Sequence, residues 1–304
     1  ARSRMAVHRP TWCAVRLLAF SALSLGARAL ELAGIRNFRA VSSRLPGVYR
    51  SAAVETATAE DCELLAAHGI TCVIDLRNAD EMAKARAKAT PHGLALAERL
   101  DCGDGRWRRI HVPVLNDMDA FFDAIEAQLP VAKRAQALLF RGFSGEQLNR
   151  LLYDALSEGG NAVLNTAMLA ANAGDFARAM HAVAEGVARG DGVLFHCAYG
   201  KDRTGVLAAL LQHAAGDSRD EIIEAYGLSE QILGRQTFMA ETNAEKIDGA
   251  DLTNLQGSPP AAMVATLQWL AAAHGSVDGY LARAGCADAW RARLLAQSTA
   301  AIAV

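Results

Sequence analysis

The reactive groups of this chain are concentrated in residues 196–205, His-Cys-Ala-Tyr-Gly-Lys-Asp-Arg-Thr-Gly, in which five residues separate Cys197 from Arg203. The apolar residues 192–195 before this segment predict a buried strand, and residues 206–211 after it predict a helix. A loop between a strand and a helix can turn its N–H groups inward, and the helix directs the positive end of its dipole at the same point. The spacing therefore predicts a binding site for an oxyanion such as phosphate.

Cys197 and Arg203 would have complementary roles in such a loop. Helix N-termini and nearby cations lower the pKa of a thiol from ~8.5 to roughly 3.5–7.5, so we expect Cys197 to be a thiolate that attacks phosphorus. The planar guanidinium of Arg203 matches two phosphate oxygens, and the loop amides would stabilise the charge of the transferred phosphoryl group. We expect Thr204 to donate a hydrogen bond to the sulfur and His196 to order the loop.

A simpler alternative is that Cys197 is one more buried cysteine at the end of a strand. The flanking strand and helix, the two glycines and the Lys-Asp-Arg-Thr sequence together favour the phosphate loop. This hypothesis requires that the sulfur be reachable and that an oxyanion fit between it and Arg203. The remaining loop residues are then expected to contact the substrate: His196, Ala198, Tyr199, Gly200 and Lys201.

Residues 196–205 resemble the signature loop of the cysteine-dependent protein tyrosine phosphatases. The Lys-Asp pair in the loop resembles the atypical, bacterial-type members, which include dual-specificity and phosphoinositide phosphatases. The resemblance extends from about Ala33 to Leu295, and it departs from the family pattern at Ala40, where the family has aspartate. The other segments that carry it are Asn-Phe-Arg at 37–39, Pro-Gly-Val-Tyr-Arg-Ser at 46–51, the strand ending in Asp-Leu-Arg at 69–77, and residues 275–281.

The resemblance implies an α/β cysteine-phosphatase fold, with a central, mostly parallel sheet flanked by helices and a helical insertion before the catalytic strand. It also implies metal-independent hydrolysis of phosphomonoesters through a phosphocysteine intermediate, with no cofactor. The expected substrates are phosphotyrosine proteins, with phosphoserine or phosphothreonine proteins and phosphoinositides as further candidates. We expect Lys201 to contact a second phosphate of an inositol head group.

The leaving group needs a proton donor, and the chain has no Trp-Pro-Asp segment of the kind that supplies one in larger tyrosine phosphatases. In the atypical subfamily, the aspartate that matches Asp202 is the usual candidate. Asp202 could equally brace the loop by pairing with Lys201 or a backbone N–H group. Asp117 and Asp119, which follow a predicted strand, are weaker candidates.

Asp75 and Arg77 lie at the end of the strand predicted at 71–76, which we expect to lie beside the loop. Both are candidate substrate-binding residues, and Asp75 is the second candidate for the proton donor. The alternative is that the two side chains form a structural ion pair. His111 is interpreted as a strand residue rather than a catalyst.

Other functions remain compatible with part of this pattern. A phosphatase for soluble inositol polyphosphates would use a similar loop. A non-catalytic pseudophosphatase would bind phosphorylated partners, although Cys197, Arg203 and Thr204 are all intact here. A rhodanese-type sulfurtransferase also has a cysteine loop, but its loop does not continue as Asp-Arg-Thr-Gly.

Start and stop signals predict the elements around the loop. Fully apolar residues 71–76 and the segment 109–114 predict strands that precede the one at 192–195. The helix signals are Thr58 with Asp61, closed by His68-Gly69; Ser218 with Glu221; Ser258-Pro259-Pro260, running to His274-Gly275; and Ser276, before Tyr280, Leu281 and Leu294.

A long, mostly helical stretch, residues 120–189, separates the second and third predicted strands. A simple crossover between parallel strands needs far fewer residues. Part of the stretch is therefore either a lid over the site or an ordinary helical layer on one face of the sheet.

Composition limits the partners of the chain. Of its 304 residues, 52% are hydrophobic and 21% charged, and the formal net charge is −2. Such a balance gives no general attraction to nucleic acid or to an anionic membrane. The cysteines have no metal-ligand spacing, so we expect no metal site, and we interpret Cys62 and Cys72 as buried thiols; the six are Cys13, Cys62, Cys72, Cys102, Cys197 and Cys286.

The first 30 residues contain several arginines, no acidic residue before Glu31, and a short apolar run at 17–25. The run is too short to span a bilayer, which needs ~20 apolar residues. We therefore predict a cleaved signal or transit peptide at 1–30, with a cytoplasmic location as the alternative. The catalytic domain is predicted at 31–298, with the insertion at about 117–190 and a tail at 299–304.

Overall fold

The computed structural model describes residues 32–102, 107–234, 251–286 and 288–296. Contacts divide the chain into Ala1–Leu30 and Glu31–Val304, and all described residues belong to the second unit. The predicted leader and the predicted tail at 299–304 lie outside the described residues, as does Cys13.

The centre of the fold is a five-stranded sheet with the order β1-β2-β5-β3-β4. Its edge strand β1 is antiparallel to β2, and the other neighbouring pairs are parallel. The mostly parallel sheet confirms the predicted fold class. The predicted strands at 71–76, 109–114 and 192–195 are present, whereas β1 and β2 were not predicted as strands. The bounds are β1 Arg39–Ala40, β2 Val48–Ser51, β3 Ile70–Asp75, β4 Arg108–His111 and β5 Gly192–His196.

Strand β5 lies between β2 and β3 and is buried on both faces, which explains its continuous apolar sequence. Val193 and Phe195 belong to the larger hydrophobic core, and Leu194 belongs to a smaller one on the opposite face. The sheet therefore separates two cores.

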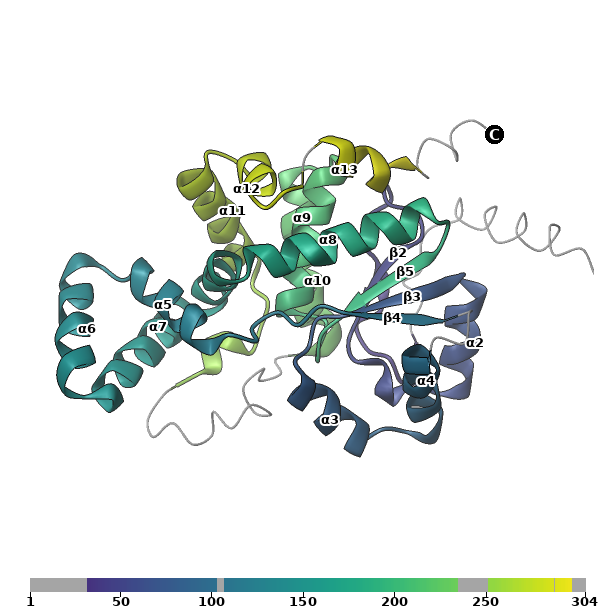
Figure 1. Cartoon of the computed structure of the whole chain (residues 1–304), viewed down its shortest axis with the longest axis horizontal. Helices are drawn as coiled ribbons and strands as arrows, with labels where there is room; N and C mark the ends of the chain where they lie inside the picture. Colours follow the sequence, from purple (N-terminus) through teal and green to yellow (C-terminus); the bar gives the residue numbers. More distant parts are fainter. Residues whose placement is uncertain (1–31, 103–106, 235–250, 287, 297–304) are drawn as a thin grey trace, which may run out of the picture. The chain divides into compact units, whose positions relative to one another are not determined.

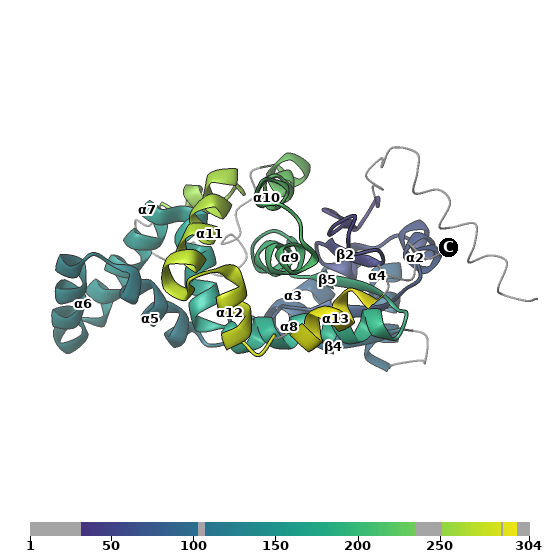
Figure 2. The ribbon, with the colours of Figure 1, turned by 90° about the horizontal axis from the view of Figure 1, so that it is seen from above.

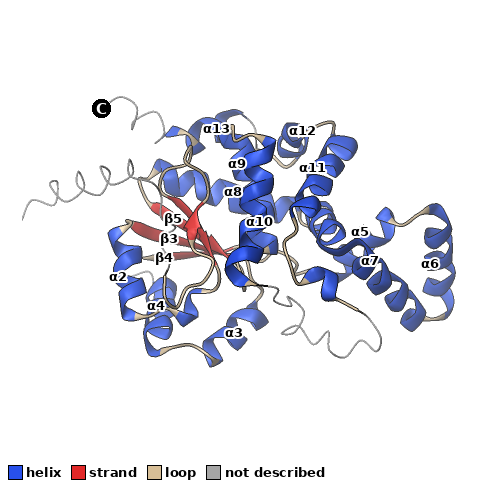
Figure 3. Ribbon diagram, turned by 180° about the vertical axis from the view of Figure 1, so that it is seen from behind, coloured by secondary structure: helices blue, strands red, loops and turns tan. Residues whose placement is uncertain are grey.

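Helices cover both faces of the sheet, as Figures 1 and 3 show. Helices α2 (Ala59–Ala67) and α4 (Pro91–Cys102) enclose the smaller core, and α8 (Ala173–Ala188) and α9 (Asp202–Ala215) pack on the other face. Helix α3 was not predicted from the sequence, nor was α4. The remaining elements are α3 Ala79–Ala87, α10 Arg219–Leu233, α11 Pro260–His274, α12 Val277–Arg283, α13 Asp288–Leu294 and the short 3₁₀ helices η2 Val54–Thr56 and η5 Thr253–Leu255.

The predicted helical stretch between β4 and β5 consists of α5 (Met118–Gln128), α6 (Val131–Phe143), α7 (Gly145–Ala171) and α8. Helix α8 is an ordinary layer on the sheet. Helices α5 and α6 lie at the end of the described unit away from the sheet, next to the first part of α7 (Figure 2). A lid function for this distal part stays a prediction.

The local capping signals gave correct helix starts. Thr58 and Ser218 each form a full capping box with the residue three positions later, and α11 begins at Pro260. The single helical segment expected after Ser276 is instead divided into α12 and α13. The division lies at Gly285, whose φ of +83° ends the first helix.

Candidate active site

The loop between β5 and α9 contains the predicted nucleophile and the predicted phosphate-binding arginine. Cys197 follows the last residue of β5, and α9 begins at Asp202. Gly200 has a φ of +64°, and a Cβ atom there would lie 2.1 Å from the Ser51 carbonyl oxygen. The first glycine of the motif is therefore required by a tight turn against β2.

The carbonyl oxygens of the loop are held from one side by groups distant in sequence. The N–H group of Ala53 donates to the Ala198 oxygen at 3.0 Å. The side-chain amide of Asn37 donates to the oxygens of Tyr199 and Gly200, at 3.1 and 2.9 Å. Since C=O and N–H point in opposite directions across a trans peptide, these bonds turn the following N–H groups to the other side of the loop.

Arg50 is a second donor to the Gly200 oxygen, at 2.7 Å. Its side chain and that of Asn37 come from the segments that carry the family resemblance near the N-terminus, but no sequence pattern indicated what they contact. Asn37 and Arg50 thus give these two segments a structural role, since each residue anchors the phosphate loop.

Arg203 is held by Glu81 of α3. Its Nη1 atom donates to Glu81 Oε2 at 2.7 Å, and Nη2 donates to Oε1. Burial alone would raise the pKa of Glu81, but the hydrogen bonds and charge of Arg203 lower it. Glu81 also closes the capping box of α3 with Asn78. The Asn-x-x-Glu pattern after the Asp-Leu-Arg strand is the signal that could have identified this carboxylate.

Cys197 and Arg203 are close enough to interact electrostatically, since the thiol group contributes to raising the pKa of Arg203. Both residues are buried, with exposed fractions of 2% and 1%. The site described here is thus enclosed, unlike the accessible sulfur that the sequence hypothesis required.

Asp202 and Lys201 are bonded to each other and to elements outside the loop. Asp202 Oδ1 accepts from Lys201 Nζ at 3.0 Å and from Asn161 Nδ2 at 3.0 Å. Lys201 Nζ also donates to the carbonyl oxygens of Leu255 and Gly257, at 2.7 and 2.8 Å. These bonds use all three donors of the ammonium group. The expected contact of Lys201 with a second phosphate would require some of them to be exchanged.

A break in α7 places Asn161 against Asp202. Gly160 has φ +56° and ψ −146°, outside the helical range, and both Gly160 and Asn161 are buried. A Cβ atom on Gly160 would lie 3.1 Å from the Asn254 carbonyl oxygen. No sequence pattern indicated the break in α7 or the role of Asn161.

Asp75 and Arg77 form the ion pair that the sequence left as an alternative. Arg77 donates through Nε to Asp75 Oδ1 at 2.9 Å and through Nη2 to Oδ2 at 2.6 Å, and it also binds Glu55. All three side chains have exposed fractions of 1% or less. Burial would raise the pKa of Asp75, but His196 and Arg77 hold it well below its usual range. A direct contact of Asp75 or Arg77 with substrate would require this cluster to open.

The other predicted residues have local roles in the structure. His196 Nδ1 lies 3.2 Å from the Cys197 carbonyl oxygen, and burial lowers the pKa of His196. The buried Thr204 hydroxyl makes no hydrogen bond with any described residue, so the expected bond to the sulfur is not formed. Ala198 and Tyr199 are the partly exposed residues of the loop.

The last candidates from the sequence, two aspartates and a histidine, lie in α5 and β4 or next to them. Asp117 caps α5 by accepting from the Ala120 N–H group at 3.0 Å, and Asp119 is exposed in the first turn of that helix. His111 Nε2 lies 2.7 Å from the Arg77 carbonyl oxygen at the end of β4. Cys72 is buried as expected, whereas Cys62 is half-buried.

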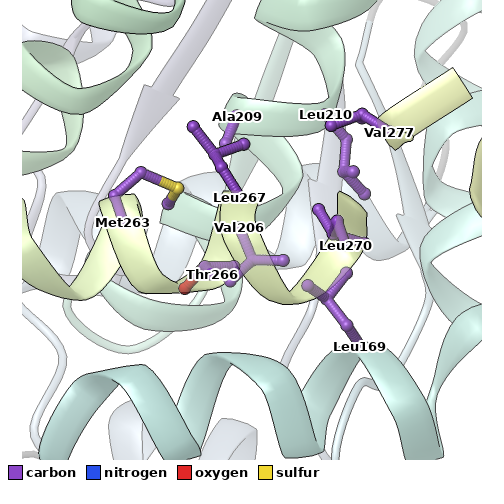
Figure 4. A pocket seen from close by; sticks show the side chains of 9 residues that line it. All are labelled: Leu169, Val206, Ala209, Leu210, Met263, Thr266, Leu267, Leu270 and Val277. Atoms are coloured by element: carbon purple, nitrogen blue, oxygen red, sulfur yellow. The ribbon is translucent and has the colours of Figure 1, made fainter. Parts of the chain in front are cut away.

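A cavity of about 10 Å³ lies between α7, α9, α11 and the start of α12, among Leu169, Leu210 and Leu270 (Figure 4). It is apolar and has room for no more than about one water molecule, so it is a packing defect and not a substrate site.

Within the described ranges, no cluster of three or more His, Cys, Asp or Glu side chains has the geometry of a metal site. None of the described helices is long and apolar enough to cross a membrane.

Comparison with known families matches residues 30–299 to a family described as the tyrosine phosphatase family. A protein of Cupriavidus necator, provisionally named a tyrosine-protein phosphatase, is 28% identical over 273 residues, which are 87% of this chain and 82% of that protein. A protein of Nostoc commune named tyrosine-protein phosphatase is 27% identical over 261 residues, 82% of this chain and 73% of its own.

A third relative matches a shorter region. The triple specificity protein phosphatase PtpB of Mycobacterium tuberculosis is 35% identical over 130 residues, which are 37% of this chain and 45% of that protein.

Proposed function

Because this chain belongs to the tyrosine phosphatase family, we propose that it hydrolyses phosphomonoesters without a metal ion, through a phosphocysteine intermediate on Cys197. The observation that carries the proposal is the anchoring of the loop carbonyl oxygens by Ala53, Asn37 and Arg50. With its carbonyl oxygens held on one side, the loop presents N–H groups on the other, where an anion is bound without reorganisation.

In the first step the Cys197 sulfur attacks phosphorus, a P–S bond forms, and the P–O bond to the leaving group breaks. Arg203 and the loop N–H groups bind the equatorial oxygens of the transferred phosphoryl group. Asp202 gives its proton to the leaving oxygen, so the product is a neutral alcohol or phenol.

In the second step water attacks the phosphorus of the phosphocysteine. Asp202, now a carboxylate, accepts the proton of that water, the P–S bond breaks, and the electron pair returns to sulfur. Inorganic phosphate leaves, and the thiolate of Cys197 is restored.

The proposed substrates are phosphotyrosine proteins, with phosphoserine and phosphothreonine proteins and phosphoinositides as further candidates. The names of the two longer-matching relatives support the first class, and the name of PtpB supports more than one. A panel of phosphotyrosine peptide, phosphoserine peptide, phosphoinositide vesicles and soluble inositol polyphosphate would separate these classes. We expect the highest kcat/KM on the phosphotyrosine peptide.

The mechanism is tested by hydrolysis of a chromogenic aryl phosphate in the presence of EDTA. We expect turnover by the wild-type protein and none above background by Cys197→Ser, with an unchanged thermal unfolding midpoint for the variant. After rapid quenching, labelled phosphate should be found on Cys197. Turnover that requires added metal, or that persists in Cys197→Ser, would reject the phosphocysteine mechanism.

A further inference from the structure

Arg50 is a buried cation without a carboxylate partner. It lies at the third position of β2 with an exposed fraction of 2%, and no ion pair to a described residue is formed. Its Nη2 atom donates to the Gly200 oxygen at 2.7 Å and lies 3.4 Å from Ser229 Oγ, while Nε has no partner among the described residues. Burying a charge is costly unless an opposite charge compensates it.

The arrangement around Arg50 is specific to the phosphate loop. A Cβ atom on Gly205 would lie 3.5 Å from Arg50 Nη2 and 3.0 Å from the ring of Tyr226. The last glycine of the loop motif therefore leaves room for the Tyr226 ring, and the guanidinium of Arg50 lies within van der Waals reach of the first turn of α9. A cation is unfavourable beside the positive end of a helix, so this position needs a reason other than stability.

The groups facing Arg50 leave a single candidate for its counter-charge. Arg203 is paired with Glu81 and Lys201 with Asp202, whereas the half-buried Arg39, like Arg50, has no carboxylate partner in the described part of the chain. The charged and titratable groups of the surrounding elements are Arg39 on β1, His196 on β5, Lys201, Asp202 and Arg203 at the start of α9, Tyr226 and Glu230 on α10, and Glu81 on α3. Of the three groups whose charge acts on Arg50, Asp202 is paired with Lys201, and burial raises the pKa of Tyr226 so that its hydroxyl stays neutral; an ionised Cys197 is the third.

The electrostatics agree with this assignment. Burial lowers the pKa of Arg50 to about 10, and Cys197, Tyr226 and Asp202 oppose that effect in this order. The guanidinium thus stays charged at neutral pH. Electrostatic attraction is mutual. The Arg50 cation, which a Cys197 thiolate stabilises, therefore also stabilises that thiolate.

We propose that Arg50 is a positioning residue for the reaction, which holds the Gly200 carbonyl oxygen away from the substrate and stabilises the Cys197 thiolate from beneath the loop. The proposal rests on the proposed phosphocysteine mechanism. It assigns Arg50 two separable effects: its hydrogen bond orients the N–H group of Lys201, and its charge keeps the nucleophile ionised.

The charge effect is tested without substrate, by the pH dependence of Cys197 alkylation with iodoacetamide. Parallel measurements on Cys197→Ser remove the signal of the other cysteines. We expect the alkylation midpoint of Arg50→Met to lie about one to three pH units above that of the wild type, and the midpoint of Arg50→Lys to stay within about half a unit. A folded Arg50→Met protein with the wild-type midpoint would overturn the charge effect.

Arg39→Met is the matched control: Arg39 is half-buried and contacts Ser229 and the loop anchor Asn37, but Cys197 is not among the groups that shift its pKa. We expect it to lower the thermal unfolding midpoint without moving the alkylation midpoint. An equal alkylation shift in both variants would mean that loosening of the loop, and not the charge of Arg50, is responsible.

The hydrogen bond is tested by kinetics on Arg50→Lys, which keeps the charge and so is the variant least prone to unfold. We expect kcat on an aryl phosphate to fall by about tenfold or more with a normal alkylation midpoint, because the Gly200 oxygen is released. Wild-type kcat in this variant would overturn the anchoring effect. If the wild-type protein itself shows no turnover, the proposed function fails, while the alkylation result still decides the charge effect.

Discussion

The carboxylate of Asp202 has two unlike oxygens. Oδ1 accepts hydrogen bonds from Lys201 and Asn161, whereas Oδ2 is buried and has no partner among the described residues. A proton on Oδ2 would disturb neither bond, so the same carboxyl group can be braced by the loop and still hold a proton. The two roles that the sequence left open for Asp202 are therefore compatible.

Replacement of Asp202 by asparagine tests the proton transfer. We expect Asp202→Asn to lower kcat by about 10²–10⁴-fold on phosphoserine peptide, whose alkoxide is a poor leaving group, and far less on an aryl phosphate with an acidic phenol. The measurement is kcat across a series of leaving groups, with Asn161→Ala as the control that loosens the brace but keeps the acid. Equal losses across the series would leave Asp202 only a structural role.

At the scale of single residues, the sequence predicted the reactive residues of the phosphate loop but not the distant residues that hold the loop in place. Cys197 and Arg203 are brought together by five intervening residues, a relation that spacing alone expresses. Asn37, Arg50 and Asn161 contact loop residues that are between 41 and 163 positions away in the sequence. No local pattern encodes contacts over such separations, because they depend on how the sheet and helices pack.

At the scale of elements, α7 shows how one residue links a helix to the site. The backbone angles at Gly160 are accessible almost only to glycine, and its neighbour Asn161 binds the loop aspartate directly. The direction of the distal half of α7 and the position of Asp202 thus depend on the same break.

Gly160→Ala should affect both stability and activity. A Cβ atom would meet the Asn254 carbonyl oxygen at 3.1 Å and would strain the backbone, at a cost of about 1–3 kcal/mol in the free energy of unfolding. We also expect kcat on phosphoserine peptide to fall as Asn161 moves from Asp202. Urea unfolding and steady-state kinetics measure the two effects.

Gly142→Ala is the matched control, because a Cβ atom there meets nothing within 4 Å and Gly142 lies inside α6. We expect it to be neutral or slightly stabilising, since alanine is the better helix former. If Gly160→Ala behaved like Gly142→Ala, the break in α7 would be unnecessary for the site.

Capping chemistry made some elements predictable and left others unrecognised. Thr58 and Ser218 stand before apolar, periodic helices, and both starts were predicted correctly. Asn78 forms the same kind of capping box, but α3 has no buried residue and so no apolar periodicity to draw attention to it. Glu81, the partner of Arg203, was missed for this reason.

At the scale of the whole described unit, the fold class followed from apolar strands that are buried on both faces, as β3 and β5 are. The enclosure of Cys197 and Arg203 did not follow, because it depends on side chains from several elements that meet only in the folded protein. The same is true of the cluster of Glu55, Arg77 and Asp75, which joins η2 to the end of β3.

This cluster makes stability depend on pH in a direction that can be worked out. Burial would raise the pKa values of Glu55 and Asp75, but Arg77, together with His196, lowers both. A carboxyl group with a lowered folded-state pKa contributes its full stability above its unfolded pKa, ~4.3 for Glu and ~3.9 for Asp, and loses it as the pH falls through the folded value. His196, whose pKa burial lowers, adds a loss that begins below ~6.5.

We therefore expect the free energy of unfolding, measured with urea between about pH 3 and pH 7, to decline gently below pH ~6.5 and steeply below pH ~4. Glu55→Gln removes one of the carboxyl groups responsible, so the steep part should flatten, whereas Glu98→Gln, an exposed carboxylate on α4, should leave the profile unchanged. The variant is also expected to be less stable than the wild type at pH 7, because Arg77 loses a buried ionic partner. A Glu55→Gln profile parallel to that of the wild type would show that the acid sensitivity arises elsewhere, and that the ion cluster beneath the phosphate loop is not where protonation weakens the fold.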